Sequence, residues 1–223
     1  MLINPIFDRH AGLLGSNCLK KLQRSSVLIA GLGGLGSTVA QLLVRTGIGT
    51  LHIVDHDTVE ESNLNRQLLY TSKDIGKPKV EIAKKRLAEI SAHTKVMPHK
   101  VKIDANFDMP DVDVIVDCLD SFSDRFILDE MAEEADIPLV HGGVARFHGQ
   151  VTVIRYGLTQ TLREIFEAVE DSGPVPVYPP LVVAVASIQA SETVKLLCGM
   201  GENLINRLLI VDMLNNTFDV IDL

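Results

Sequence analysis

A glycine-rich loop, Gly31-Leu32-Gly33-Gly34-Leu35-Gly36, is the feature that most constrains the fold of this chain. The apolar run from Ser26 to Ala30 before it has the composition of a buried strand, and the apolar spacing from Ser37 to Arg45 after it is helical. Glycines between a strand and a helix permit a tight turn and let backbone N–H groups approach a phosphate at the helix N-terminus. The loop therefore predicts a nucleotide-binding α/β domain, although a strand–helix turn without a ligand would read in the same way.

Strands and helices alternate through the first half of the chain, which indicates a mainly parallel sheet covered on both faces. Further strands are predicted over 50–55, 112–117, 138–140 and 150–154. Further helices are predicted over 78–90, 125–135 and 181–197, and a closing hairpin over 208–212 and 218–221. No internal repeat or low-complexity linker is present. We expect a single domain over residues 1–223 with a Rossmann-like, doubly wound, mainly parallel sheet and antiparallel C-terminal strands.

Charge and hydropathy exclude several classes of protein. The net charge of −8 gives no overall attraction to nucleic acid or to an anionic membrane, so neither is an expected partner. The N-terminus lacks the charged and apolar regions of a secretory signal, and the most apolar stretch, 174–186, is too short to span a bilayer. A cytoplasmic protein is expected.

The cysteines and histidines show no metal-binding pattern. Cys18, Cys118 and Cys198 are far apart and form no Cys-x-x-Cys pair, so a thiolate zinc site is not expected. Each cysteine is expected to pack as a small buried apolar residue. The seven histidines show no ligand spacing, and we predict none of them to bind a metal.

Charged residues beyond the loop bear on which nucleotide is bound. Asp55, at the end of the second predicted strand, is placed to accept hydrogen bonds from ribose hydroxyls, which fits NAD and ATP equally. Arg66 and Lys79 favour ATP, because two cations could converge on a polyphosphate and stabilise charge on a leaving pyrophosphate. Either cation alone would be explained as a solvated surface charge. Asp120 follows the strand at 112–117 at the carboxyl edge of the sheet and is a candidate Mg²⁺ ligand.

Several ordered motifs make the sequence resemble the ThiF/MoeB/HesA family, the bacterial relatives of ubiquitin-activating enzymes. The resemblance extends from about Phe7 to Gly199. Besides the glycine loop, it rests on Val54-Asp55-His56-Asp57, Asn63-Leu64-Asn65-Arg66-Gln67, Gly76-Lys77-Pro78-Lys79, Asp117-Cys118-Leu119-Asp120 and Gly149-Gln150.

The resemblance implies an adenylyltransferase that uses ATP and Mg²⁺. Its substrate would be the C-terminal glycine carboxylate of a small ubiquitin-like sulfur carrier with a Gly-Gly tail, and pyrophosphate would be released. Asp120 would hold the Mg²⁺, and Arg9 would reach into the partner subunit's site, which implies a homodimer with Arg9 acting in trans. The implied catalytic residues are Arg9, Arg66, Lys79 and Asp120. The implied nucleotide-binding residues are Gly31, Gly33, Gly34, Gly36, Asp55 (ribose), Asp57, Asn63, Arg66, Gln67 and Lys79, with Asn63, Arg66 and Lys79 on the phosphates.

The chain departs from many members of this family in its cysteines. It lacks the two zinc-binding Cys-x-x-Cys pairs, and the crossover segment Val169-Glu170-Asp171-Ser172-Gly173-Pro174 has no thiol. Cys118, inside the Asp-Cys-x-Asp motif, is expected to be a packed residue. The expected enzyme therefore has no zinc, forms no thioester or persulfide of its own, and stops at the acyl-adenylate.

Other functions stay open at this point. Segments 7–15 and 45–49 also resemble the relatives that act on threonylcarbamoyladenosine in tRNA, but the acidic chain has no basic extension. A noncatalytic scaffold that binds a carrier tail would keep the fold, although the joint presence of Arg66, Lys79 and Asp120 argues against it. An NAD dehydrogenase lacks a candidate hydride-transfer His or Tyr–Lys pair. The sequence does not choose between carriers of thiamine and molybdopterin synthesis.

Overall fold

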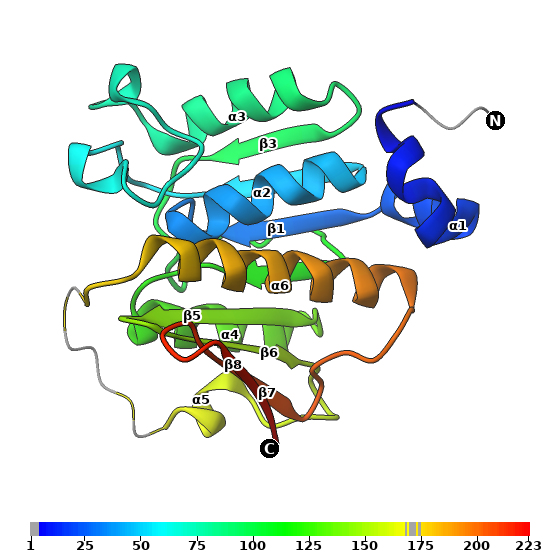
Figure 1. Cartoon of the computed structure of the whole chain (residues 1–223), viewed down its shortest axis with the longest axis vertical. Coiled ribbons are helices and arrows are strands. Elements are labelled where there is room, and N and C mark those ends of the chain that lie inside the picture. The colour runs from blue at the N-terminus through cyan, green and yellow to red at the C-terminus, as the bar shows by residue number, and fades with distance from the viewer. Residues whose placement is uncertain (1–4, 168, 170–172, 174) are drawn as a thin grey trace.

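One eight-stranded sheet runs through the molecule, and helices cover both of its faces (Figure 1). The computed structural model describes residues 5–167, 169, 173 and 175–223. In sheet order the strands are β3 (Lys95–His99), β2 (Thr50–Val54), β1 (Ser26–Ala30), β4 (Val114–Asp117), β5 (Leu139–Ala145), β6 (His148–Ile154), β7 (Arg207–Asp212) and β8 (Thr217–Asp222). The first five are parallel and the last three pair antiparallel. The predicted fold class is confirmed.

The helices divide between the two faces of the sheet. One face carries α1 (Asp8–Leu22), α2 (Gly34–Thr46), α3 (Lys79–Ile90) and α6 (Pro179–Cys198). The opposite face carries α4 (Phe122–Glu134) and the short α5 (Leu162–Ile165). Short 3₁₀ turns are formed by Pro5–Phe7, Glu61–Asn63 and Ser72–Asp74.

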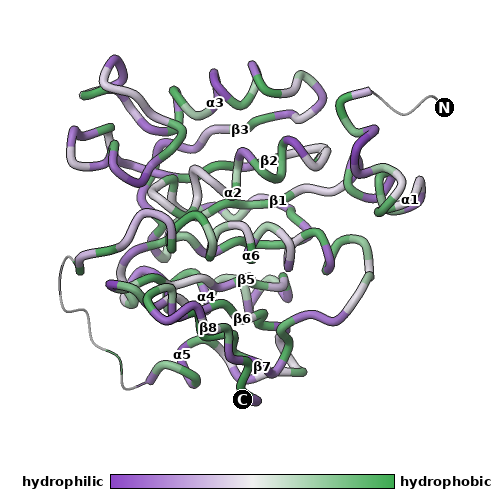
Figure 2. Tube along the Cα trace, viewed as in Figure 1, coloured by the Kyte–Doolittle hydropathy of each residue, from purple (hydrophilic) through white to green (hydrophobic). Residues whose placement is uncertain are grey.

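The central strand β1 shows why both faces need cover. Val27 and Ile29 pack into the core under α2 and α6, whereas Leu28 and Ala30 pack into the core under α4, and all four are fully buried. Successive side chains of a strand point to opposite faces, so a continuous apolar run is stable only between two layers of helix. Figure 2 shows hydrophobic residues concentrated in the central strands and α6, with hydrophilic residues on the outer turns.

Helix α6 is the most apolar element. Among the described residues it is the one helix that is long and apolar enough by composition to cross a membrane. The expectation that the most apolar stretch, 174–186, is too short for this therefore underestimated the length of the apolar segment. Half of its apolar window is buried inside the protein, where Leu181, Val185 and Ala186 join the core beside α2. Its composition is therefore explained by packing across the middle of the sheet (Figure 1).

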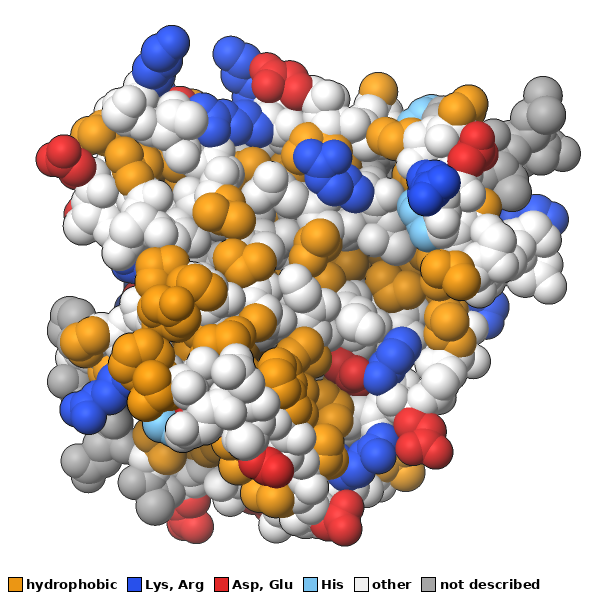
Figure 3. All heavy atoms as spheres, in the orientation of Figure 1, with side chains coloured by type: hydrophobic (Ala, Val, Ile, Leu, Met, Phe, Trp, Pro, Cys, Tyr) orange, Lys and Arg blue, Asp and Glu red, His pale blue; other side chains and the backbone are white. Residues whose placement is uncertain are grey.

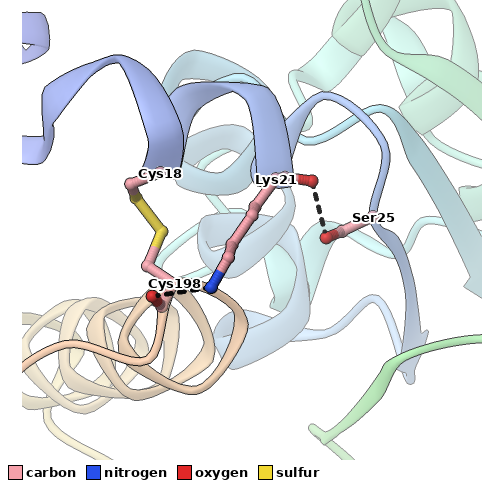
Figure 4. The surroundings of a disulfide bond; sticks show 4 residues. All are labelled: Cys18, Lys21, Ser25 and Cys198. Carbon is pink, nitrogen blue, oxygen red and sulfur yellow. Dashed lines mark hydrogen bonds between the residues drawn. A yellow bond between two sulfur atoms is a disulfide. The ribbon is translucent and has the colours of Figure 1, made fainter.

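Two of the three cysteines are joined, which the sequence analysis did not predict. Cys18 of α1 and Cys198 at the end of α6 form a disulfide bond across a separation of 180 residues (Figure 4). Lys21, one turn further along α1, donates to the backbone oxygen of Cys198 at 3.3 Å. The expectation of three independent thiols was wrong for this pair, because the C-terminal ends of α1 and α6 lie side by side. Cys118 is free and buried, as expected.

Candidate functional site

The glycine loop turns sharply between β1 and α2. Gly31 has a φ of +89°, and a Cβ on it would lie 2.7 Å from the backbone oxygen of Cys118. A Cβ on Gly36 would lie 1.8 Å from the backbone oxygen of Gly31, so a side chain at either place is incompatible with the turn. A Cβ on Gly33 would meet only Gln67, at 3.7 Å. The turn therefore leaves open space in front of Gly33.

That open space faces the N-terminus of α2. Gly33 is the N-cap residue and supplies no side chain to the first N–H groups of the helix. Unpaired N–H groups and the helix dipole attract anions, above all phosphates. An uncapped helix N-terminus therefore lies where the glycine spacing predicts a phosphate site.

Asp55 and Tyr70 hold the loop in place. The Asp55 carboxylate accepts hydrogen bonds from the Leu32 N–H and the Asp57 N–H, both at 2.7 Å. The Tyr70 hydroxyl donates to the Leu32 carbonyl at 3.0 Å, and burial raises the pKa of Tyr70, so the hydroxyl stays protonated. Asp55 therefore lies at the loop, as the sequence predicts, and also fixes the backbone of Leu32.

Lys79 begins α3 and is buried beside two carboxylates. Its Nζ lies 2.9 Å from Asp57 Oδ2 and 4.0 Å from Asp55 Oδ2. Partial burial raises the pKa of Asp57, but the hydrogen bond and charge of Lys79 outweigh it and hold that pKa below its usual value. Asp55, His56 and Asp57 bring potential metal ligands within 4.8 Å of one another. The Lys79 ammonium already supplies the positive charge there, so we assign no metal to them.

Arg66 reaches the loop from the turn that follows Glu61–Asn63. Its NH1 donates to the Ser62 carbonyl and to Asn65 Oδ1, both at 3.0 Å. These partners are neutral, and no ion pair of Arg66 is formed within the described parts of the chain. A Cβ on Gly34 would lie 3.5 Å from Arg66 Cγ. The guanidinium charge is therefore uncompensated, and the aliphatic part of the Arg66 side chain lies beside the loop.

Two amides complete this side of the site. Asn63 is buried, and its Oδ1 accepts from the Glu60 N–H at 3.1 Å, which closes its own turn. Gln67 is buried beside Gly33, and its Oε1 has no hydrogen-bond partner among the residues that the structure describes. A buried amide oxygen without a partner is costly, and a hydroxyl donor such as that of a ribose would satisfy it.

Asp120 lies across the loop from these residues. It follows β4, and the contact between the Cys118 oxygen and Gly31 places its turn directly against the loop. Asp120 is exposed, and its carboxylate makes no hydrogen bond or ion pair within residues 5–167. An uncommitted carboxylate at the carboxyl edge of the sheet suits a divalent cation such as Mg²⁺.

Arg9 does not join this cluster within the chain. It lies in the first turn of α1, and the neighbouring Phe7 packs 3.2 Å from the Cβ position of Gly47, at the far end of α2. The 13 residues of α2 span about 20 Å, so α1 begins at the opposite edge of the sheet from the loop (Figure 1). The structure thus gathers every predicted site residue except Arg9.

Sequence reasoning missed a largely buried polar cluster beside the turn that carries Asp120. It contains Asp117, Arg125, His141, Gln150 and Gln189. Two of these, Asp117 and Gln150, belong to motifs that carry the resemblance, but nothing in their spacing indicates the other partners.

An open helix N-terminus flanked by two cations, buried acids and a free carboxylate defines a nucleotide-binding α/β domain. Comparison with known proteins identifies the family to which this domain belongs. The chain belongs to the ThiF family, whose model matches residues 7–223. It is 34% identical over 219 residues to the sulfur carrier protein adenylyltransferase of Thermus thermophilus, covering 92% of this chain and 81% of that protein.

Further relatives agree on the class of enzyme. The molybdopterin-synthase adenylyltransferase of Haemophilus influenzae is 36% identical over 204 residues, covering 86% of this chain and 83% of that protein. The chain spans 45% of the adenylyltransferase and sulfurtransferase MOCS3 of Drosophila grimshawi, with 39% identity. The fold matches Escherichia coli MccB crystallised with ATP, with a TM-score of 0.87, 21% identity, and coverage of 99% of this chain and 71% of that one. The chain is an ATP-dependent adenylyltransferase.

Proposed function

We propose that this adenylyltransferase activates the C-terminal glycine carboxylate of a small ubiquitin-like sulfur-carrier protein. The observation that carries the proposal is the open N-terminus of α2 at Gly33, with Arg66 beside Gly34 and the turn that bears the free Asp120 carboxylate against Gly31. A carrier is proposed as the substrate because two relatives that match most of this chain bear the names of a sulfur carrier and a molybdopterin-synthase adenylyltransferase.

The residues present fit ATP with Mg²⁺. The uncapped helix suits a phosphate, and Gln67 Oε1 suits a ribose hydroxyl. Asp120 would hold Mg²⁺, which when bound supplies positive charge to the phosphates. Arg66 would add an uncompensated cation, and Lys79, which pairs with Asp57 in this structure, would add a second by exchanging that partner for a phosphate.

The charges of the two reactants determine what the site has to supply. A carboxylate oxygen of the carrier forms a bond to the α-phosphorus, and the bond from that phosphorus to the bridging oxygen of pyrophosphate breaks. The attacking group is already an anion, so no general base is needed. The residues of the chain have to offset repulsion between two anions and align them, which is the role we propose for Arg66 and Lys79.

An apolar surface beside the antiparallel strands is the proposed docking place for the carrier. The exposed rings of Phe147 and Tyr178 lie 5.2 Å apart, and the Phe147 carbonyl accepts from Met213, next to the exposed Leu214. Figure 3 shows hydrophobic side chains gathered over this half of the molecule. Exposed apolar patches of this kind are typical of protein-binding surfaces.

We further propose that the enzyme stops at the acyl-adenylate and that another protein delivers sulfur. Burial raises the pKa of the Cys118 thiol well above its usual value, and the other two cysteines are disulfide-bonded. The crossover segment 169–174 lies outside the described residues except for Val169 and Gly173, and its sequence has no cysteine. The active unit is proposed to be a homodimer with Arg9 in trans, since Arg9 lies far from the loop of its own chain.

ATP–pyrophosphate exchange in the presence of a carrier ending in Gly-Gly tests the function. Asp120→Ala should lower exchange by about 10²–10³ and leave the melting temperature unchanged. Asp124→Ala is the matched control. Asp124 also carries a carboxylate and lies nearby in the first turn of α4, but its carboxylate pairs with Lys102 at 3.1 Å. The carrier should gain the mass of AMP, with no covalent adduct to the enzyme. Undiminished exchange in Asp120→Ala would refute the assignment.

A further inference from the structure

Asp120 is followed by α4, and a largely buried cluster of polar side chains lies beside the turn that carries Asp120. Asp117, His141 and Gln189 are fully buried, and Arg125 is nearly so. They come from β4, β5, α6 and α4, so the cluster joins four elements at one point. Buried charges are costly unless they are paired, and here each charged group has a hydrogen-bond or ion-pair partner within the cluster.

The cluster forms hydrogen bonds with the backbone of Leu119, the residue immediately before Asp120. The Leu119 N–H donates to Asp117 Oδ1 at 3.0 Å. The Leu119 carbonyl accepts from both Nε and NH2 of Arg125, at 3.1 and 2.5 Å. Both backbone groups of Leu119 are therefore held by charged side chains.

The rest of the turn is held in the same way. The Asp117 carbonyl accepts from Gln189 Nε2 at 2.7 Å, and the Cys118 N–H donates to the Ala30 carbonyl at 2.9 Å. The backbone leading to Asp120 is thus hydrogen-bonded at Asp117, Cys118 and Leu119, whereas the Asp120 carboxylate itself makes no hydrogen bond or ion pair in the described structure. A fixed backbone with a free side chain is the arrangement expected of a preorganised ligand.

Arg125 is itself fixed by its neighbours. Its Nε lies 3.7 Å from Asp117 Oδ2, its NH1 lies 3.5 Å from His141 Nε2, and its guanidinium lies 5.1 Å from the centre of the Phe122 ring. Asp117 Oδ2 also lies 2.7 Å from His141 Nδ1. Burial lowers the pKa of His141 and outweighs the opposing effect of Asp117, so the neutral ring donates from Nδ1 and accepts at Nε2.

We propose that Arg125 is a positioning residue that sets the Asp120 carboxylate for the metal–nucleotide complex by clamping the Leu119 carbonyl. The inference rests on the proposed function in one respect, the binding of Mg²⁺ with ATP at Asp120. Arg125 makes no hydrogen bond or ion pair with Asp120 in the described structure, so its effect passes through the backbone of Leu119. Residues that orient metal ligands from behind typically change metal affinity or activity by about 10- to 100-fold when substituted.

Calorimetric titration of ATP, once with EDTA and once with Mg²⁺, isolates this role. Arg125→Lys keeps the charge beside Asp117 but replaces two fixed donors to Leu119 with one flexible ammonium. We expect the Mg²⁺-dependent gain in ATP affinity to fall by about 10- to 100-fold, with the Kd for metal-free ATP unchanged. A loss of packing alone would weaken both.

Arg163→Lys is the matched control. Arg163 also stacks on an aromatic ring, 4.6 Å from the centre of Phe126, and pairs with Glu130, but it makes no contact with Leu119 in the described structure. It should keep the wild-type Mg²⁺ effect. If Arg125→Lys does not fold, His141→Asn, which keeps a donor for Asp117, should show the same selective loss to a smaller extent.

The outcomes separate the two proposals. A wild-type Mg²⁺ effect in folded Arg125→Lys, or in His141→Asn when it takes its place, overturns the positioning role. Mg²⁺-dependent ATP binding by the wild-type protein, without exchange for any carrier, overturns the proposed substrate and leaves the role of Arg125 standing.

Discussion

Alanine at Gly33 and alanine at Gly36 should separate nucleotide binding from folding. A Cβ at Gly36 would lie 1.8 Å from the Gly31 oxygen, which would have to retreat by roughly 1.5 Å to restore ordinary contact. Retreat is blocked because Gly31 already packs against the Cys118 carbonyl. Overpacking of this kind costs typically about 1–3 kcal/mol, and we expect the upper end or more here.

Gly33→Ala should have the opposite profile. The nearest atom to its Cβ is Gln67 Nε2 at 3.7 Å, an ordinary contact, so the free energy of unfolding should change by no more than about 1–2 kcal/mol. The methyl group would stand in the space before the first N–H groups of α2. Loss of one charge-assisted hydrogen bond costs about 2–3 kcal/mol, which corresponds to a rise of roughly 30- to 150-fold in the Kd for MgATP.

Urea unfolding and calorimetric titration with MgATP measure both effects. Gly12→Ala in α1 is the control, because a Cβ there meets nothing within 4 Å, and it should leave the Kd unchanged. Wild-type affinity in Gly33→Ala would show that the phosphates do not bind at this turn. Equal stability of Gly36→Ala and Gly12→Ala would show that the turn does not need its glycine.

Two further predictions concern stability. Reduction of the Cys18–Cys198 bond, or its replacement by two alanines, should lower the free energy of unfolding by about 5 kcal/mol, from the loop-closure entropy of 180 residues; equal urea midpoints with and without reductant would contradict this. Burial raises the pKa of Asp74, but hydrogen bonds from Thr71 and the charge of Arg86 outweigh it and hold that pKa below 3.8. The stabilisation is therefore present above pH 3.8 and lost as the pH falls further, so Asp74→Asn should be destabilising at pH 7 and the difference should shrink below pH 4. A difference in unfolding free energy between wild type and Asp74→Asn that does not change with pH would refute this role of the Asp74 carboxylate.

The elements predicted from sequence are those whose pattern is decided locally. β1 is an apolar run ended by glycine, and α3 has apolar residues at helical spacing, so each was predicted within a residue or two. β3 was missed because Pro98 interrupts it, and the strand forms nonetheless because, among the described residues, it lies at the sheet edge and pairs with β2 alone. α1 was missed because Gly12 and Gly15 weaken its helical pattern, and the chain kinks at Gly15.

The same distinction between local pattern and tertiary packing applies to the residues of the candidate site. The residue types at the sheet edge follow from the order of strands and loops, so Asp55, Lys79 and Asp120 could be nominated from sequence alone. Their partners could not, because these depend on tertiary packing. Asp117 and His141 are 24 residues apart and meet only because β4 and β5 pair in parallel. The disulfide depends in the same way on where α1 and α6 end.

That disulfide turns most of the chain into a covalent ring. Residues 18–198 include β1 to β6, the glycine loop, Lys79 and Asp120, whereas β7, β8 and the first turns of α1 lie outside. A single cut of the backbone anywhere inside the ring leaves one molecule, and two fragments separate only after reduction. A nicked protein would then run as an intact band without reductant, with all of the proposed nucleotide-binding residues still joined covalently.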